Sequence, residues 1–258
     1  MAEIRLAKIM ADRRLCSRRE AEKMIAAGLV RVDGVVVSQQ GCKFSEDVAI
    51  TIERDTSGYA DSTATIMIHK PDGYVSNLPE PGQLEARELL TVERMQGALD
   101  RRECRAIISQ KASLAVAGRL DRASRGLLLM TFNGLVVKYL TALKCHEKEY
   151  IVTVEKKIEP SHIQALCDMR DLAGEVIQPM QVKKISHSKL CMVLNEGKNQ
   201  QIRRACRKAG LNVMDLMRVR VGPLTLGDLK EGCWRVLRED EVKSIVYPER
   251  EAGAAMPT

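Results

Sequence analysis

Short strands alternate with helical segments from Thr65 to about Tyr247, and this alternation constrains the fold more than any other feature of the sequence. The hydrophobic spacing predicts strands over 65–69, 127–131, 150–154, 190–194 and 217–221. It predicts helices near 84–95, 135–142, 160–169, 198–209 and 239–246. The mixture indicates an α+β domain over residues 65–247.

Residues 1–53 are expected to form a separate small unit of two helices and a sheet. Apolar residues at helical spacing open it, and a capping box of Ser17 and Glu20 starts a second helix that ends near Gly28. Valine-rich segments on either side of the Asp33-Gly34 turn predict a tight hairpin, and a further strand follows over 48–52.

Two segments lack the pattern of a folded element. Residues 54–64 are small, polar and aperiodic, which is typical of a linker between domains. Residues 248–258 have no apolar face to bury, so we expect a disordered tail there.

Composition narrows the class of partner. A chain of 258 residues that is 45% hydrophobic can build one large core or two small ones. Its 41 Lys and Arg against 34 Asp and Glu leave a net charge of +7, which favours polyanions such as nucleic acid. No apolar run approaches the roughly 18 to 20 residues that span a bilayer, and no signal sequence opens the chain, so a cytoplasmic protein without membrane contact is expected.

The sequence gives no sign of a metal or an organic cofactor. The eight cysteines form no CxxC pair, which disfavours zinc clusters and disulfide frameworks and favours reduced thiols packed as small hydrophobes. The glycine-rich nucleotide motifs and the HExxH metal motif do not occur, and the four histidines are scattered.

A polar run directly before a strand is the first candidate for chemistry. In GRLDRASRGLLLMTFNG, residues 118–134, the strand is a rigid element that holds Arg119, Asp121 and Ser124 at its entrance. From this segment alone, Asp121 is either a working carboxylate or a turn residue. The segment HKPDGYVSN, residues 69–77, indicates only a loop.

Cations gather in two places. The helix opened by NEGKNQQIRRACRKAG carries four of them within two turns, which requires compensation by carboxylates or by phosphates. A second cluster lies at the junction of the two N-terminal helices and suits a phosphate backbone, although a solvated basic face is the alternative. The helix cations are Arg203, Arg204, Arg207 and Lys208, and the N-terminal cations are Arg13, Arg14, Arg18, Arg19 and Lys23.

These motifs in this order resemble a known family. The run RLAKIMADRRLCSRREAEKMIAAGLVRVDGVVV resembles the alpha-L RNA-binding module named after a ribosomal small-subunit protein. HKPDGYVS, GRLDRASRGLLLMT, KEYIV and LNEGKNQQIRR resemble the four ordered motifs of the ribosomal RNA pseudouridine synthases. The resemblance implies a small RNA-binding domain and a larger catalytic domain built on a mixed, mainly antiparallel sheet with flanking helices.

The resemblance also assigns roles to residues. It implies that Asp121 is the catalytic aspartate, Tyr150 the base-stacking tyrosine, Arg203 the arginine that pairs with the aspartate, and Leu194 a packing leucine at the substrate. Forming pseudouridine requires breaking the glycosidic bond, rotating the uracil and rejoining it through carbon, so a carboxylate must attack the sugar or stabilise its positive charge. A cation keeps such a carboxylate ionised in a closed site. The remaining expected contacts are Arg119, Lys70 and Arg204 with substrate, and Lys198, Arg207 and the N-terminal cations with RNA.

The sequence departs from the family pattern in three places, and the last two concern substrate choice. The interval between Ser76 and Gly118 is long, and its charged stretch 91–114 looks like an insertion, either a solvated helix or a surface that contacts RNA or a partner through Arg101, Arg102 and Arg105. Phe132 stands where the family usually has a polar residue, and Gln200 where it often has a basic or imidazole group.

The leading hypothesis is therefore an RNA pseudouridine synthase without cofactor, acting as a monomer on ribosomal RNA or ribosome-assembly intermediates. Resemblance in KNQQIRRACRKAG favours the large-subunit members. An RNA-binding or ribosome-assembly protein without catalysis is the alternative, and Asp121, Tyr150 and Arg203 together argue against it. A glycoside or nucleoside hydrolase would usually pair two acids, whereas here one acid faces a basic site.

Overall fold

The computed structural model describes residues 3–13, 15–16, 18–52, 64–141 and 146–246. Most of the predicted linker 54–64 and the whole predicted tail 248–258 lie outside these residues. No helix in the described ranges is both long and apolar enough to cross a membrane.

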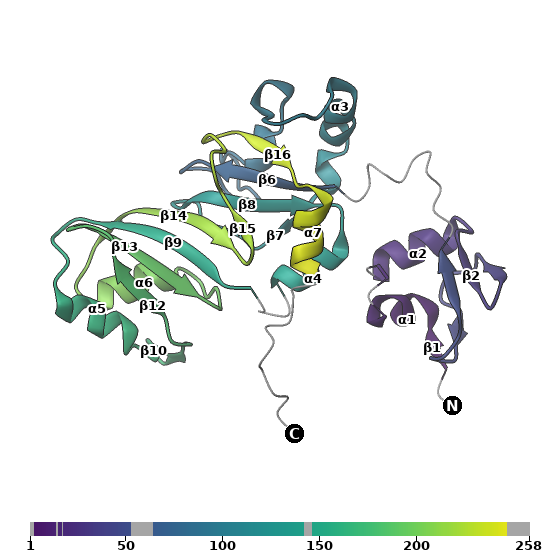
Figure 1. Cartoon of the computed structure of the whole chain (residues 1–258), viewed down its shortest axis with the longest axis horizontal. Helices are drawn as coiled ribbons and strands as arrows, with labels where there is room; N and C mark the ends of the chain where they lie inside the picture. Colours follow the sequence, from purple (N-terminus) through teal and green to yellow (C-terminus); the bar gives the residue numbers. More distant parts are fainter. Residues whose placement is uncertain (1–2, 14, 17, 53–63, 142–145, 247–258) are drawn as a thin grey trace.

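The N-terminal unit has the expected two helices and small sheet (Figure 1). Leu6, Met10 and Ile25 are fully buried between the helices and the sheet, so the helical spacing of the sequence corresponds to a real core. The hairpin turns at Asp33-Gly34 as predicted, where both residues have positive φ, and the last strand begins at Ile50. The elements are β1 Ile4–Arg5, α1 Leu6–Asp12, α2 Arg18–Ala26, β2 Val30–Val32, β3 Val35–Val37, β4 Lys43–Phe44 and β5 Ile50–Ile52.

The larger domain is built on one nine-stranded sheet of mixed, mainly antiparallel pairing, as the resemblance implied. The order is β12-β13-β9-β14-β8-β6-β16, with β15 beside β14 and β7 beside β8. Among these pairs only β14 and β8 run parallel. The strands are β6 Thr65–Lys70, β7 Ala115–Ala117, β8 Arg125–Thr131, β9 Lys148–Val154, β12 Gln181–Lys184, β13 Lys189–Leu194, β14 Val213–Val221, β15 Leu224–Thr225 and β16 Trp234–Val236.

Helices cover the sheet, and the alternation of side chains along β8 shows how. Leu127 and Leu129 belong to a core cluster that includes residues of α4 Gly134–Thr141 and α7 Glu239–Val246, which pack side by side (Figure 1). Leu128 and Met130 belong to a second cluster, which includes residues of α5 Pro160–Cys167 and α6 Gln201–Lys208. Neighbouring residues of a strand point to opposite faces, so the apolar run 127–130 of β8 is buried on both faces of the sheet.

The prediction of a helix near 84–95 is wrong. Two short 3-10 turns replace it, η2 Ala86–Leu89 and η3 Val92–Arg94. The backbone is extended at Thr91, and the Thr91 carbonyl accepts a hydrogen bond of 2.8 Å from the indole of Trp234. A tertiary contact therefore fixes a break that helical spacing could not reveal.

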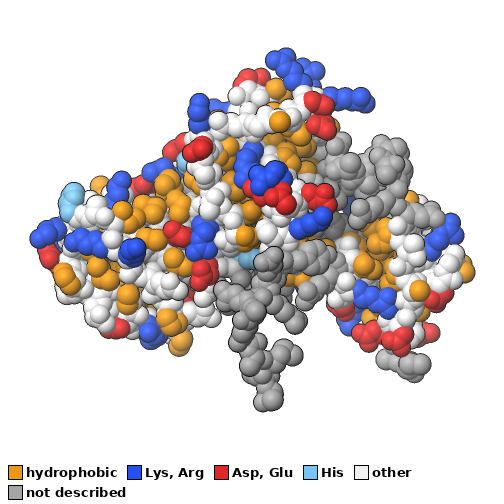
Figure 2. Space-filling model, in the orientation of Figure 1, with side chains coloured by type: hydrophobic (Ala, Val, Ile, Leu, Met, Phe, Trp, Pro, Cys, Tyr) orange, Lys and Arg blue, Asp and Glu red, His pale blue; other side chains and the backbone are white. Residues whose placement is uncertain are grey.

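The charged stretch 91–114 does contain a helix, α3 Arg101–Ser109, followed by the turn η4 Lys111–Ser113. Asp100 caps α3 by accepting hydrogen bonds from the amides of Arg102 and Glu103, and Cys104 and Ile107 anchor it in the core. Its arginines are exposed, and basic side chains project from this region in Figure 2.

Candidate active site

Asp121 lies in the turn directly before β8, and its side chain is partly exposed. The Ser124 amide donates a 3.1 Å hydrogen bond to the Asp121 carbonyl and closes the turn. Ser76, in the loop after β6, binds the residue before Asp121: its hydroxyl donates to the Leu120 carbonyl at 2.6 Å and accepts from the Leu120 amide at 2.9 Å. Two loops far apart in sequence thus meet at Asp121.

Lys70 binds the residue after Asp121. Its ammonium group donates to the carbonyls of Arg122, Pro71 and Tyr74 at 3.3, 2.8 and 2.6 Å, and the Gly73 amide donates to the same Arg122 carbonyl at 3.0 Å. The Arg122 guanidinium returns a bond of 3.1 Å to the Gly73 carbonyl. The turn is therefore fixed on both sides of the aspartate.

Lys70 has 0% of its surface exposed, which corrects the expectation of a direct contact with substrate. Burial lowers the pKa of Lys70 to about 8, against the opposing effect of the carboxylates of Asp72 and Asp121. The lysine holds loops together, and its charge lies within electrostatic range of Asp121.

Arg203 reaches the same turn from α6, but it does not pair with the aspartate. Its guanidinium donates to the carbonyl of Ala123 and, at 3.2 Å, to that of Val213. Within the described ranges, no ion pair of Asp121 occurs. The expected salt bridge is thus absent, because backbone carbonyls take the guanidinium donors; Nε of Arg203 is buried without a partner.

Tyr150 and Leu194 lie in the core of the larger domain. Tyr150, on β9, is 9% exposed and is paired across the sheet with Met192 of β13 and Arg218 of β14. It shares a core cluster with Leu194, which is 3% exposed, and with Leu120 beside the aspartate. That Tyr150 and Leu194 meet the substrate beside Asp121 stays a prediction.

Arg119 is exposed, two residues before Asp121, so it is available to a ligand. Ser124 is buried, and its hydroxyl has no hydrogen-bond partner among the described residues. Phe132 packs against the core, which explains an apolar residue there, whereas Gln200 is exposed with a left-handed backbone at φ 46°.

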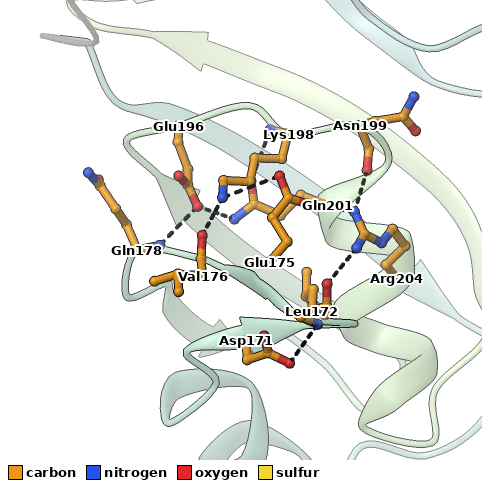
Figure 3. Close-up of polar contacts among 11 residues, drawn as sticks. Asp171, Leu172, Glu175, Val176, Gln178, Glu196, Lys198, Asn199, Gln201 and Arg204 are labelled. Atoms are coloured by element: carbon orange, nitrogen blue, oxygen red, sulfur yellow. Dashed lines mark hydrogen bonds and ion pairs between the residues drawn. The ribbon is translucent and has the colours of Figure 1, made fainter.

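Two of the four α6 cations, Arg204 and Lys208, pair with carboxylates of a small hairpin, β10 Asp171–Leu172 and β11 Glu175–Val176 (Figure 3). Glu175 pairs with Arg204 at 3.1 Å and with Lys198, which precedes α6, at 3.3 Å, and Asp171 pairs with Lys208 at 3.7 Å. Hydrogen bonds from Arg204 and Lys198 lower the pKa of Glu175. The sequence left carboxylates and phosphates open as partners, and this structure supplies carboxylates to Arg204 and Lys208.

The loop between β13 and α6 is tied to the same hairpin. The buried carboxylate of Glu196 accepts hydrogen bonds from the Gln178 amide at 2.9 Å and from the Gln201 side chain at 2.8 Å (Figure 3). Sequence reasoning missed Glu196, although an acid inside a basic motif was a visible signal. Arg207, in contrast, is exposed on α6.

The N-terminal cations are only partly described. Arg18 and Lys23 are exposed on α2, whereas Arg13 donates to the carbonyls of Glu46 and, at 2.7 Å, of Val48. Arg13 therefore also holds the loop before β5. Arg14 lies outside the described residues, and so does the side chain of Arg19.

One residue of the site was not identified from the sequence at all. Arg218 of β14 is 1% exposed, and its guanidinium donates to the carbonyls of Gly118, Arg119 and Leu127 at 2.8, 3.4 and 2.8 Å. Nearby, Arg125 at the start of β8 holds Asp215 of β14 through two bonds of 2.8 and 2.7 Å. The pKa of Asp215 is lowered by this hydrogen-bonded guanidinium.

Comparisons with known proteins agree with this architecture. A family model described as RNA pseudouridylate synthase matches residues 64–208, and one described as S4 domain matches residues 4–46. The chain is similar to a crystal structure of a pseudouridylate synthase, with a TM-score of 0.63 and 25% identity over 94% of this chain and 100% of that chain.

Similar sequences span nearly the whole chain. An RNA pseudouridine synthase of Aquifex aeolicus is 32% identical, covering 94% of this chain and 96% of the relative. The dual-specificity RNA pseudouridine synthase RluF of Escherichia coli is 31% identical, covering 93% and 78%. The ribosomal small subunit pseudouridine synthase A of Vibrio cholerae is 31% identical, covering 94% and 99%.

Proposed function

This chain belongs to the RNA pseudouridylate synthase family, and we propose that it isomerises a specific uridine of ribosomal RNA, expected in the large subunit. The observation that carries the proposal is the Asp121 turn. A partly exposed carboxylate stands between two residues, Leu120 and Arg122, whose backbone groups are fixed by Ser76, Gly73 and Lys70. Rigid placement of a reacting group is a major source of catalysis.

Asp121 is the group proposed to act on the sugar. It attacks the ribose carbon or stabilises the positive charge that develops there as the bond to the uracil nitrogen breaks. The uracil then turns and bonds to the sugar through carbon, which releases Asp121 if it had bonded to the sugar. That carbon gives up its proton to a base, and the ring nitrogen freed from the sugar takes up a proton. One bond and one proton have then changed places within one nucleotide, so the reaction requires neither a redox partner nor an activated donor.

Tyr150 and Leu194 are proposed to bind the uracil base, and Arg203 is proposed to act on Asp121. Tyr150 offers a flat ring to an extruded uracil, next to Leu194, and its phenol is a candidate acceptor for the proton. Arg203 is proposed to act on Asp121 from the Ala123 carbonyl, where it already touches the turn. Because these groups belong to one chain, a monomer is sufficient for the proposed site.

RNA contacts are proposed on both domains. Arg119 and Arg207 are exposed in the larger domain, and Arg18 and Lys23 in the S4 domain. Lys198 and Arg204 would have to exchange Glu175 for phosphate before they could bind RNA. Phosphate contacts of this kind would hold the RNA while the site selects the uridine.

The test is base-resolution mapping of pseudouridine by carbodiimide adduct and primer extension. Ribosomal RNA of both subunits and transfer RNA are incubated with wild type, with D121N and with D168N, a control at an exposed carboxylate directly after α5. A new stop in large-subunit RNA with wild type and D168N, and none with D121N, is expected.

Other outcomes separate the alternatives. A stop only in small-subunit or transfer RNA would overturn the proposed target, and product from D121N would remove Asp121 from its role. Tight binding without a stop on any RNA would favour the alternative function, an RNA-binding or assembly protein.

A further inference from the structure

Arg218 is a buried arginine whose guanidinium donates hydrogen bonds to three backbone carbonyls. Its side chain is 1% exposed, and no carboxylate lies within ion-pair distance of it in the described part of the chain. Removing a guanidinium from water is costly unless hydrogen bonds compensate it. The three carbonyls compensate this cost, so their positions show which part of the chain Arg218 holds in place.

These partners lie on both limbs of one loop, that is, in the segments directly before and after its turn. Gly118 and Arg119 directly precede the Leu120-Asp121 pair, whereas Leu127 lies beyond the turn, on β8. One side chain thus closes the segment 118–127, which carries Asp121 near its middle. Arg218 contacts the limbs, while Ser76 and Lys70 contact the tip.

The backbone of this region is shaped to admit Arg218. Gly126 has φ 107°, and a Cβ atom there would lie 2.2 Å from the Arg218 carbonyl oxygen. Only glycine allows β14 to approach β8 this closely, so the entry of Arg218 under the loop depends on Gly126.

The charge of Arg218 also lies near the site. Lys70 is within electrostatic range of both Arg218 and Asp121, so two buried cations flank the turn. In surroundings with little water, positive charge nearby favours the ionised form of a carboxylate. The arginine therefore brings positive charge close to the turn that it also binds through the carbonyls of Gly118 and Arg119.

We propose that Arg218 is a positioning residue for the reaction: by joining both limbs of segment 118–127, it determines where the Asp121 carboxylate and the Arg119 side chain lie. The inference rests on the proposed function. A residue of merely structural importance would change the folded fraction, whereas a positioning residue changes the rate of the molecules that are folded.

The test compares R218K with R220K. Arg220 lies on the same strand, but it donates to Glu149 at 2.8 Å and to Glu147 at 3.2 Å, away from the Asp121 turn. Three quantities are measured: the single-turnover rate at saturating RNA per folded molecule, the Kd for RNA, and hydrogen exchange of the amides in segment 118–124. Lysine keeps the charge but cannot reach three carbonyls with a planar fork.

R218K is expected to lower the rate per folded molecule by about 10-fold to 100-fold, because small displacements of a reacting group have effects of this size. Its Kd is expected to stay within about threefold of wild type, and exchange in 118–124 is expected to accelerate. R220K is expected to leave all three quantities near wild type.

An unchanged rate per folded molecule in R218K, or an equal loss in R220K, would overturn the proposal. If R218K does not fold, R218Q is measured in the same way, since its amide retains donors for the loop. A wild-type protein that modifies no RNA would instead refute the proposed function, and the exchange data would still report whether Arg218 orders the loop.

Discussion

The hydroxyl of Ser76 satisfies both backbone groups of Leu120, donating to its carbonyl at 2.6 Å and accepting from its amide at 2.9 Å. Ser76 is 3% exposed and Leu120 is 6% exposed, so water has little access to this contact. The segment 69–77 is therefore joined to the segment 118–134 by one side chain, which binds the residue directly before Asp121 across a separation of 44 residues in the sequence.

We predict that S76A loses stability and activity together. Two buried backbone groups lose their partner, which costs about 1–3 kcal/mol for each unsatisfied group. Urea unfolding and the single-turnover rate measure the two effects. S109A, at an exposed hydroxyl of α3, is the matched control and is expected to stay near wild type; equal behaviour of the two variants would contradict the proposed role of Ser76.

We predict that E175Q tightens RNA binding. Arg204 and Lys198 both pair with Glu175, so removing its charge leaves two cations available for phosphate. The dependence of Kd on salt concentration is the measurement, and the slope is expected to become steeper. E159Q, which affects an exposed pair with Lys157, is the control; weaker binding by E175Q would show that the hairpin supports the RNA surface instead of competing with it.

We predict that replacing Arg18 and Arg19 by alanine weakens RNA binding while sparing chemistry at saturating RNA. Each lost phosphate contact should reduce the slope of log Kd against log salt by about 0.7 to 0.9. R238A is the control. Arg238 is an exposed arginine as well, but it lies directly before α7 in the other domain, where it pairs with Asp240. Unchanged affinity would identify the N-terminal cluster as a solvated basic face.

We predict that the pair of Asp215 and Arg125 makes stability depend on pH in the acid range. The pKa of Asp215 is lowered in the folded protein by the Arg125 guanidinium. Its stabilising effect is therefore fully present above the unfolded pKa, about 3.9, and is lost as the pH falls through the folded value.

D215N is accordingly expected to be less stable than wild type at pH 7, with a difference that narrows as the pH falls below about 4. Urea unfolding at several pH values measures this. D240N is the comparison, because Asp240 and its partner Arg238 are about 70% and 68% exposed and contribute little. If the two proteins differ in free energy of unfolding by the same amount at every pH, Asp215 stabilises the fold through its packing and not through its charge.

The sequence by itself determined the local elements and the order of the motifs. The Asp33-Gly34 hairpin formed as predicted because these residues tolerate positive φ, and the run 127–130 of β8 is buried on both faces because all of its residues are apolar. Local backbone preferences and the period of apolar residues act over short stretches, so they can be interpreted without the fold. The four ordered motifs were likewise sufficient to predict the family, and the comparisons confirm it.

The partners of charged side chains were decided only by the tertiary structure. Lys70 was expected at the substrate and is buried, and Arg203 was expected on the Asp121 carboxylate and instead contacts the Ala123 carbonyl. In each case backbone carbonyls accept the hydrogen bonds, and at least one of these carbonyls, that of Arg122 or Ala123, comes from a distant segment. Such acceptors exist at every residue and leave no mark in the sequence.

Arg218 and Arg220 show the same limit on a single strand. In the run RVRV, residues 218–221, the two arginines are two positions apart. The alternation of side chains along a strand therefore predicts that both point to the same face. The pairing of β14 with β9 shifts register between them, so that Arg218 lies opposite Tyr150 and Arg220 opposite Glu149. Since a one-residue shift exchanges the faces of a strand, one arginine enters the site and the other pairs with carboxylates at the surface.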